Sequence, residues 1–218
     1  MYKRQVLFWD EQLSSSRTVA CGTCHRAETG GSDPRSVNGT ASATAPGPDG
    51  VLGTTDDITG SPGVVLTDAN GDYAQAAVFG LGVQVTTRHA PSFINAAYAP
   101  NLFWDGRART TFLDPVTGDT VLFAGGALEN QCTAPPVSSV EMAHEGRLWT
   151  DAATRIAGAE PLALAAAIPA ALQTYVGGRS YPQLFAEAFG SSNVTRASHS
   201  RSPPTSARSS RTLRRSTR

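Results

Sequence analysis

Long hydrophobic runs are absent from the sequence, and none approaches the ~20 apolar residues that a membrane-spanning helix needs. We therefore expect no membrane span. The first residues also reach charged side chains too soon for a secretory signal peptide. Either the protein stays inside the cell or the sequence lacks its true start.

The formal net charge of zero conceals two regions of opposite charge. Seven of the 18 basic residues lie within residues 195–218, which hold no acid, so residues 1–194 carry about −7. A nucleic-acid-binding surface needs basic side chains to contact phosphates. The acidic body therefore argues against a nucleic-acid partner.

The composition supports a globular core, because 40% of the 218 residues are hydrophobic and 17% are charged. Residues 27–87 differ from the rest, since they are rich in Gly, Pro, Asp, Ser and Thr and show no sustained hydrophobic period. A stretch of this length without regular structure predicts a long loop that is either tied down by a ligand or disordered.

Helical signals begin at about residue 126. Leu164, Ile168 and Leu172 recur every four residues, which predicts one buried helix face with a bend at Pro169. Residues 181–189 predict a second short helix. We therefore expect a mainly α fold with long irregular loops.

Three shorter patterns predict local structure. Pro91 suits the first turn of a helix. Residues 114–121 predict a turn or short hairpin. Residues 68–72 carry the first oxygen ligands of an EF-hand calcium loop but are not followed by its Gly and Glu, so we expect a simple turn there.

Cys21-Gly22-Thr23-Cys24-His25 is the sharpest chemical signal in the chain. The C-x-x-C-H spacing is typical of covalent c-type haem attachment, in which each thiol adds to a vinyl group and the histidine binds the iron. A thioredoxin-like pair would need a βαβ context, and structural zinc would need a second pair of ligands. Neither is visible, so we predict one haem c held by Cys21, Cys24 and His25.

The motif stands among segments that resemble the bacterial di-haem cytochrome c peroxidases. Further residues around Gln131 and Glu141 extend the resemblance, which covers roughly residues 5–194. The segments that carry it are Leu7-Phe8-Trp9-Asp10, Leu13-Ser14, Ala90-Pro91-Ser92, Asn95-Ala96-Ala97-Tyr98, Leu102-Phe103-Trp104-Asp105-Gly106-Arg107-Ala108 and Val140-Glu141-Met142.

This resemblance implies that residues 1–194 form the N-terminal, peroxidatic haem domain, with an all-α cytochrome-c-like fold. It implies His25 as the proximal iron ligand and Glu141 as the distal acid/base group. It also implies Trp104 as the aromatic residue between two haems and Gln131 as a distal-pocket amide. Arg107 is a candidate partner for a haem propionate, because a guanidinium fits a carboxylate bidentately.

Each of these side chains also has a plain structural interpretation. Glu141 is alternatively a solvated surface acid, Trp104 a core residue and Arg107 a member of a surface ion pair. The sixth iron ligand is open. His89 is a candidate distal ligand, with an ordinary surface histidine as the alternative, while His144 would share a helical face with Glu141.

By the same resemblance, the activity is cytochrome c peroxidase: hydrogen peroxide is reduced to water with electrons from a small c-type cytochrome or a cupredoxin. The location would be the periplasm. In the full-length protein a C-terminal haem domain would follow, with calcium between the two domains. A second C-x-x-C-H is absent from this sequence. The rival interpretations are a mono-haem electron carrier without enzyme activity and an inactive fragment.

Residues 195–218 form a basic tail in which Leu213 is the only large apolar residue. Because nothing in it can bury an apolar face, we expect it to be disordered. Its Arg, Ser, Pro, Thr and Ala content is what GC-rich DNA yields out of frame, so we expect a frameshift near residue 195. A basic arm that binds nucleic acid or a membrane surface is the alternative.

Overall fold

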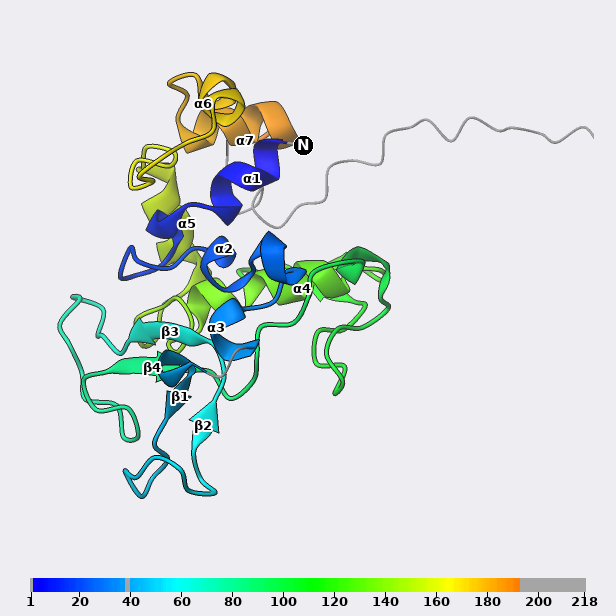
Figure 1. The fold of residues 1–218 in the computed structure, drawn as a ribbon. Coiled ribbons are helices and arrows are strands. Elements are labelled where there is room, and N and C mark those ends of the chain that lie inside the picture. Colours follow the sequence, from blue (N-terminus) through cyan, green and yellow to red (C-terminus); the bar gives the residue numbers. More distant parts are fainter. Residues whose placement is uncertain (1, 38–39, 193–218) are drawn as a thin grey trace, which may run out of the picture.

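The structure is a computed structural model that describes residues 2–37 and 40–192. Most of its α-helices gather at one end and four short strands at the other, with the small helix α2 between them (Figure 1). The α-helices are α1 (Tyr2–Phe8), α2 (Cys21–Cys24), α3 (Pro34–Val37), α4 (Ala127–Thr133), α5 (Trp149–Ala157), α6 (Ala170–Val176) and α7 (Tyr181–Phe189). Within the described part of the chain, no helix is both long and apolar enough to cross a membrane.

The strands form three separate antiparallel pairs, β1–β2, β3–β4 and β5–β6. Their bounds are β1 (Thr44–Ala45), β2 (Ile58–Thr59), β3 (Pro62–Val65), β4 (Val83–Val85), β5 (Phe112–Leu113) and β6 (Thr120–Leu122). The fold is therefore mixed, and the expectation of a mainly α fold is not borne out. The strands were not predicted because each is only two to four residues long, which is too short to show an alternating pattern of apolar and polar residues.

Residues 27–87 contain regular structure, contrary to the prediction of one long irregular loop. The first two strand pairs lie in this range, together with α3 and the 3-10 helices η2 (Ala27–Thr29) and η3 (Ala41–Ala43). The turn at residues 68–72 is confirmed, since the Asp68 carboxylate accepts the backbone N–H groups of Asn70 and Asp72. The hairpin predicted at residues 114–121 is confirmed, since residues 114–119 connect the antiparallel strands β5 and β6.

One of the two helices predicted near the C-terminus is confirmed in full, and the other only in part. The helix at Tyr181–Phe189 is confirmed, and Gly190 follows it with φ of 71°. The predicted helix with a bend at Pro169 is confirmed only in its second half, because Pro169 is not helical and α6 begins at Ala170. Pro91 also begins no helix, since the next helical turn is η4 at Ala96–Tyr98.

Asp10 joins the N-terminal and C-terminal helices inside the core. Its side chain is buried. One of its carboxylate oxygens accepts hydrogen bonds from the Tyr181 hydroxyl and from the Leu162 backbone N–H. The other oxygen accepts the backbone N–H of Gln12. The apolar core around it packs α1, α5, α6 and α7 together through Val6, Leu13, Ile156, Leu172, Tyr181, Leu184 and Phe185. This core supports the segment that leads into α2.

Candidate functional site

The C-x-x-C-H motif forms α2 and the residue that follows it. Its N-terminus is capped by the hydroxyl of Thr23, which accepts the backbone N–H of Ala20 at 2.9 Å. The helix packs directly on the indole of Trp9, since a Cβ at Gly22 would lie 2.3 Å from Trp9 Cε3. Only glycine therefore lets this turn approach Trp9. Cys21 and Cys24 are not joined by a disulfide.

The imidazole of His25 has a fixed orientation. Its Nδ1 lies 2.8 Å from the carbonyl oxygen of Gly31. A carbonyl oxygen only accepts hydrogen bonds, so Nδ1 carries the proton and Nε2 is left as the nitrogen with a lone pair. Phe93 lies 6.2 Å from the imidazole, between ring centroids, and also packs against Gly31. A histidine held in this way is suited to bind a metal through Nε2.

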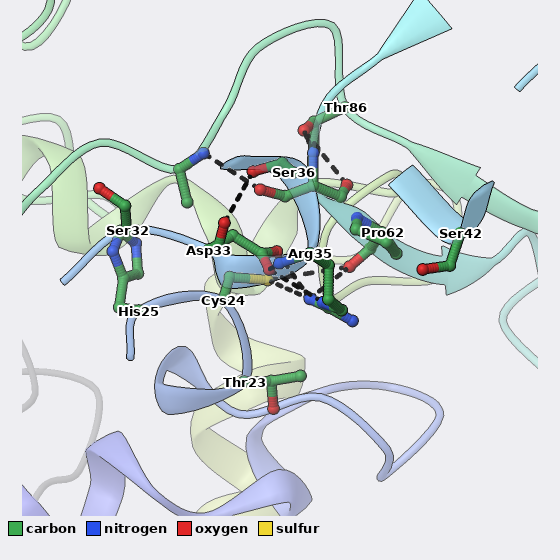
Figure 2. Close-up of polar contacts among 12 residues, drawn as sticks. Thr23, Cys24, His25, Ser32, Asp33, Arg35, Ser36, Ser42, Pro62 and Thr86 are labelled. Carbon is green, nitrogen blue, oxygen red and sulfur yellow. Dashed lines mark hydrogen bonds and ion pairs between the residues drawn. The ribbon is translucent and has the colours of Figure 1, made fainter. Parts of the chain in front are cut away.

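The two motif thiols lie in different surroundings. Burial, with a contribution from nearby Cys132, raises the pKa of Cys21 to about 12. Burial also raises the pKa of Cys24, to about 11, although the charge of Arg35 acts against it. The Cys24 Sγ accepts a hydrogen bond from Arg35 Nη2 at 3.4 Å, as Figure 2 shows.

Glu141 belongs to a tight turn that is anchored to the strand region. The backbone N–H groups of Glu141, Met142 and Ala143 all donate to the carbonyl of Ser138. The turn is pressed against β3, because a Cβ at Gly63 would lie 1.9 Å from the Val140 carbonyl oxygen. Glu141 is therefore placed by backbone contacts between segments that are distant in sequence.

Contacts of β3 place Glu141 beside the motif. The carbonyl oxygen of Pro62 lies 3.8 Å from Cys24 Sγ, and a Cβ at the next residue, Gly63, would lie 3.0 Å from the Glu141 Cα. Burial raises the pKa of Glu141, and the Ser138 hydrogen bond and the positive charge of Arg107 act against that rise. The charge of Glu141 in turn contributes to the raised pKa of Cys24. Of the expected site residues, Cys24, His25 and Glu141 thus lie in one neighbourhood. Glu141 is half-buried there, and its role stays a prediction.

A comparison with protein families identifies the chain. The family model described as di-haem cytochrome c peroxidase matches residues 5–209. The chain belongs to the di-haem cytochrome c peroxidase family. A search among curated proteins gives no match. The family is one of haem-dependent oxidoreductases, and the matched range ends inside residues 195–218, which lie outside the described part of the chain.

The motif residues fit the haem that this family name implies. Two thiols that are not paired with each other stand one helical turn apart, and the adjacent imidazole keeps Nε2 for a metal. Thiols and imidazole are the side chains that c-type haem requires at this spacing. Exposed apolar side chains of Trp9, Phe93 and Ile94 lie near the motif, and apolar contacts of this kind suit a porphyrin.

Trp104 and Arg107 lie together on the surface of this family member. The Trp104 side chain is 85% exposed, so the alternative of a core residue is wrong. The Arg88 guanidinium lies 4.9 Å from the centre of its ring and forms an ion pair with Asp105. Arg107 pairs with the same carboxylate at 3.2 Å, which is the surface ion pair considered above.

The remaining expected residues occupy separate positions. Gln131 is partly buried in α4, and Cys132 next to it is exposed. His89 is exposed after β4. His144 follows the Glu141 turn rather than sharing a helix with it. Its Nδ1 lies 3.0 Å from the hydroxyl of Ser15, which accepts the His144 backbone N–H. The roles of Gln131 and His89 stay predictions.

Sequence reasoning missed three charged residues that shape the site. Asp33 and Arg35 form an ion pair next to Cys24. An aspartate and an arginine two positions apart in the sequence could have indicated this pair. Arg147 is buried and donates to the carbonyl oxygens of Leu13 and Pro136, which links the motif's N-terminal segment to the Glu141 region. Among the described residues no group of three or more His, Cys, Asp or Glu side chains converges as a metal site, so the expected calcium has no cluster within them.

Proposed function

We propose that this chain reduces hydrogen peroxide to water as the peroxidatic haem domain of a cytochrome c peroxidase. Each peroxide takes up two electrons and two protons and yields two water molecules. The observation that carries the proposal is the packing of the Glu141 turn on Gly63, next to the Pro62 carbonyl that Cys24 contacts, which supports a carboxyl group beside the C-x-x-C-H motif. An electron carrier without enzyme activity has no use for a proton-transfer group at this position.

The residues of the motif would hold the cofactor. Cys21 and Cys24 would form the two thioether bonds, and His25 Nε2 would bind the iron while Nδ1 stays bonded to Gly31. The bound haem supplies the redox chemistry. The hydrogen bond to Gly31 increases the electron density on the imidazole and fixes its ring, as neighbouring acceptors do for metal-binding histidines generally.

Glu141 would move the proton that peroxide cleavage requires. Cleavage of the O–O bond needs a proton taken from one peroxide oxygen and delivered to the other. A carboxyl group whose pKa is raised by burial is better matched to both steps than a solvated one. The positive charge of Arg107 nearby favours the ionised carboxylate, which is the form that accepts the first proton.

The exposed Trp104 would serve the delivery of electrons. The Arg88 guanidinium stacked against it and the Asp105 ion pair restrain a side chain that would otherwise be free in solvent. We propose a small c-type cytochrome or cupredoxin as the ultimate donor, with electrons passing through a second haem domain. The periplasm is the matching location.

The test is a rapid-mixing experiment with the haem-loaded chain and one equivalent of peroxide. We expect a spectral change whose rate rises linearly with peroxide concentration and one peroxide consumed per two electrons delivered by a chemical reductant. A haem that is six-coordinate in both redox states and inert to peroxide would contradict the proposal and support the electron-carrier alternative.

A further inference from the structure

A cavity of about 200 Å³ lies between the segment that leads into α2, the turn at residues 68–72 and α5. None of the expected haem-site residues lines it. It is smaller than the ~300–1,000 Å³ of sites for drug-sized molecules, so it suits a small ligand. Arg17, Arg155 and His144 contribute to its walls, together with Ser15 and Asp68.

The guanidinium of Arg155 is held in place at this cavity. Its Nη1 donates to the carbonyl oxygens of Ser15 at 2.9 Å and of Ser14 at 3.4 Å. Burial lowers the pKa of Arg155, and the positive charge of Arg17 lowers it further. The two guanidinium groups therefore lie close enough to repel each other.

These two arginines have no acidic partner. Within the part of the chain that the structure describes, neither Arg17 nor Arg155 forms an ion pair with a carboxylate. Asp68 lies on the cavity wall, but its oxygens already accept the backbone N–H groups of Asn70 and Asp72 and the side-chain amide of Asn70. The cavity is thus left with an excess of positive charge, on a body that is acidic overall.

A third arginine adds to the positive charge near the cavity. Arg147 is buried, and its Nη1 donates to carbonyl oxygens rather than to a carboxylate. Burial and the charge of Arg155 lower the pKa of Arg147 to about 10, while Asp151 acts in the opposite direction. Arg155 is therefore repelled by Arg147 as well as by Arg17, and a bound anion would offset both repulsions.

Ser15 and His144 complete the polar wall. Ser15 Oγ accepts the backbone N–H of His144 at 2.8 Å and lies 3.0 Å from its Nδ1, so the imidazole has a fixed place. Hydroxyl and imidazole groups can both donate to an anion oxygen. Arg17 itself has a φ of 60°, in the left-handed region that residues other than glycine rarely enter. Strained backbone of this kind is concentrated at ligand-binding sites.

We propose that Arg17 and Arg155, with His144 beside them, bind a small oxyanion of the phosphate class. Each guanidinium offers paired N–H donors that match two oxygens, so two of them match a phosphate group better than a single carboxylate. A phosphate group also carries more than one negative charge at pH 7. The bound anion would connect the segment before α2 to the turn at residues 68–72 and to α5. This ligand site goes beyond the proposed peroxidase function and does not depend on it.

The first experiment titrates inorganic phosphate into the whole chain, produced with haem-maturation machinery, by calorimetry at constant ionic strength. It compares wild type with Arg17→Gln, Arg155→Gln and the control Arg109→Gln, since Arg109 is exposed and does not line the cavity. We expect wild type to bind one phosphate saturably. Arg17→Gln and Arg155→Gln should each lower the affinity about tenfold or more, the effect of losing a hydrogen bond from a charged donor. Arg109→Gln should match wild type.

Thermal unfolding distinguishes a ligand-binding arginine from a structural one. In chloride alone, Arg17→Gln should unfold at a higher temperature than wild type, because the variant loses the repulsion between the two guanidinium groups. Added phosphate should raise the midpoint of wild type and leave that of Arg17→Gln unchanged. A less stable Arg17→Gln protein whose midpoint rises with phosphate as much as that of wild type would overturn the inference.

Glycerol phosphate and acetate, tested at the same ionic strength, define the ligand class. Tighter binding of glycerol phosphate than of inorganic phosphate would assign the site to a phosphorylated metabolite, and the reverse order to free phosphate. Acetate that binds as tightly as phosphate, a wild type without saturable heat, or an equal loss of affinity in Arg109→Gln would overturn the inference. None of these results bears on the reaction with peroxide, so the proposed function stands or falls separately.

Discussion

Replacement of Glu141 by glutamine isolates the proposed proton transfer from everything else at the site. The two side chains have the same shape, and the amide can still accept the hydrogen bond of Ser138. The turn itself is held by backbone bonds to the Ser138 carbonyl and by the packing of Val140 on Gly63, which the variant leaves intact. The change therefore removes a titratable group and little else.

The expected loss is that of a missing general acid/base group, about 10²–10⁴-fold in rate. This corresponds to a rise of about 2.7–5.4 kcal/mol in the activation free energy. The assay is the rate of the spectral change after rapid mixing of the haem-loaded chain with peroxide. It does not depend on a second haem domain, because it follows a single reaction with peroxide.

Glu145→Gln is the matched control, since Glu145 is exposed and lies four residues further along the chain. It should react at the wild-type rate. Haem content should be the same in all three proteins. A Glu141→Gln protein that reacts within a few-fold of wild type would remove Glu141 from the mechanism and refute the reasoning from its half-buried position.

Three further changes test the structural basis of the site. Tyr181→Phe should lower the free energy of unfolding in urea by about 1.5–3 kcal/mol, because it removes a buried hydrogen bond to the Asp10 carboxylate; an unchanged midpoint would contradict that bond. Gly63→Ala should slow the peroxide reaction by tenfold or more while haem content persists, since the new Cβ displaces the Val140 carbonyl, and a wild-type rate would show that the turn is not anchored there. Asp33→Asn should be less stable than wild type at pH 7 by about 2 kcal/mol. Burial acts to raise the pKa of Asp33, but the hydrogen bonds and charge of Arg35 lower it overall, so the stabilisation exists above the ordinary aspartate pKa and is lost as the pH falls through the lower value of the folded protein. Urea titrations of the two proteins should therefore converge at acid pH, and a constant difference would contradict the ion pair.

The parts of the fold that follow from local sequence were predicted well. Helix α7 has an apolar face, a proline in its first turn and a glycine stop, all within ten residues. The start of α6 was misplaced because the apolar period continues through Pro169, where the backbone is extended. The strands near Pro62 and Val83 escaped prediction, since each is stabilised by its partner from a distant segment rather than by its own pattern.

The candidate site divides in the same way. The C-x-x-C-H chemistry is contained in five consecutive residues and needs no tertiary information. The nearness of Glu141 to the motif depends on the packing of β3 against the turn after α4, which no local pattern encodes. Only the family resemblance pointed to it. Arg35 was missed because its partner sulfur lies eleven residues away, across a turn whose geometry the sequence does not specify.

Covalent attachment of haem is the central claim, and intact-protein mass spectrometry under denaturing conditions tests it most directly. The chain is produced in a periplasm with haem-maturation machinery, beside the variant in which Cys21 and Cys24 are both serine. We expect wild type to carry the mass of one haem through denaturation and the double variant to have the mass of the bare polypeptide. A wild-type chain whose haem dissociates on denaturation, or a double variant that keeps it, would contradict covalent attachment through these cysteines.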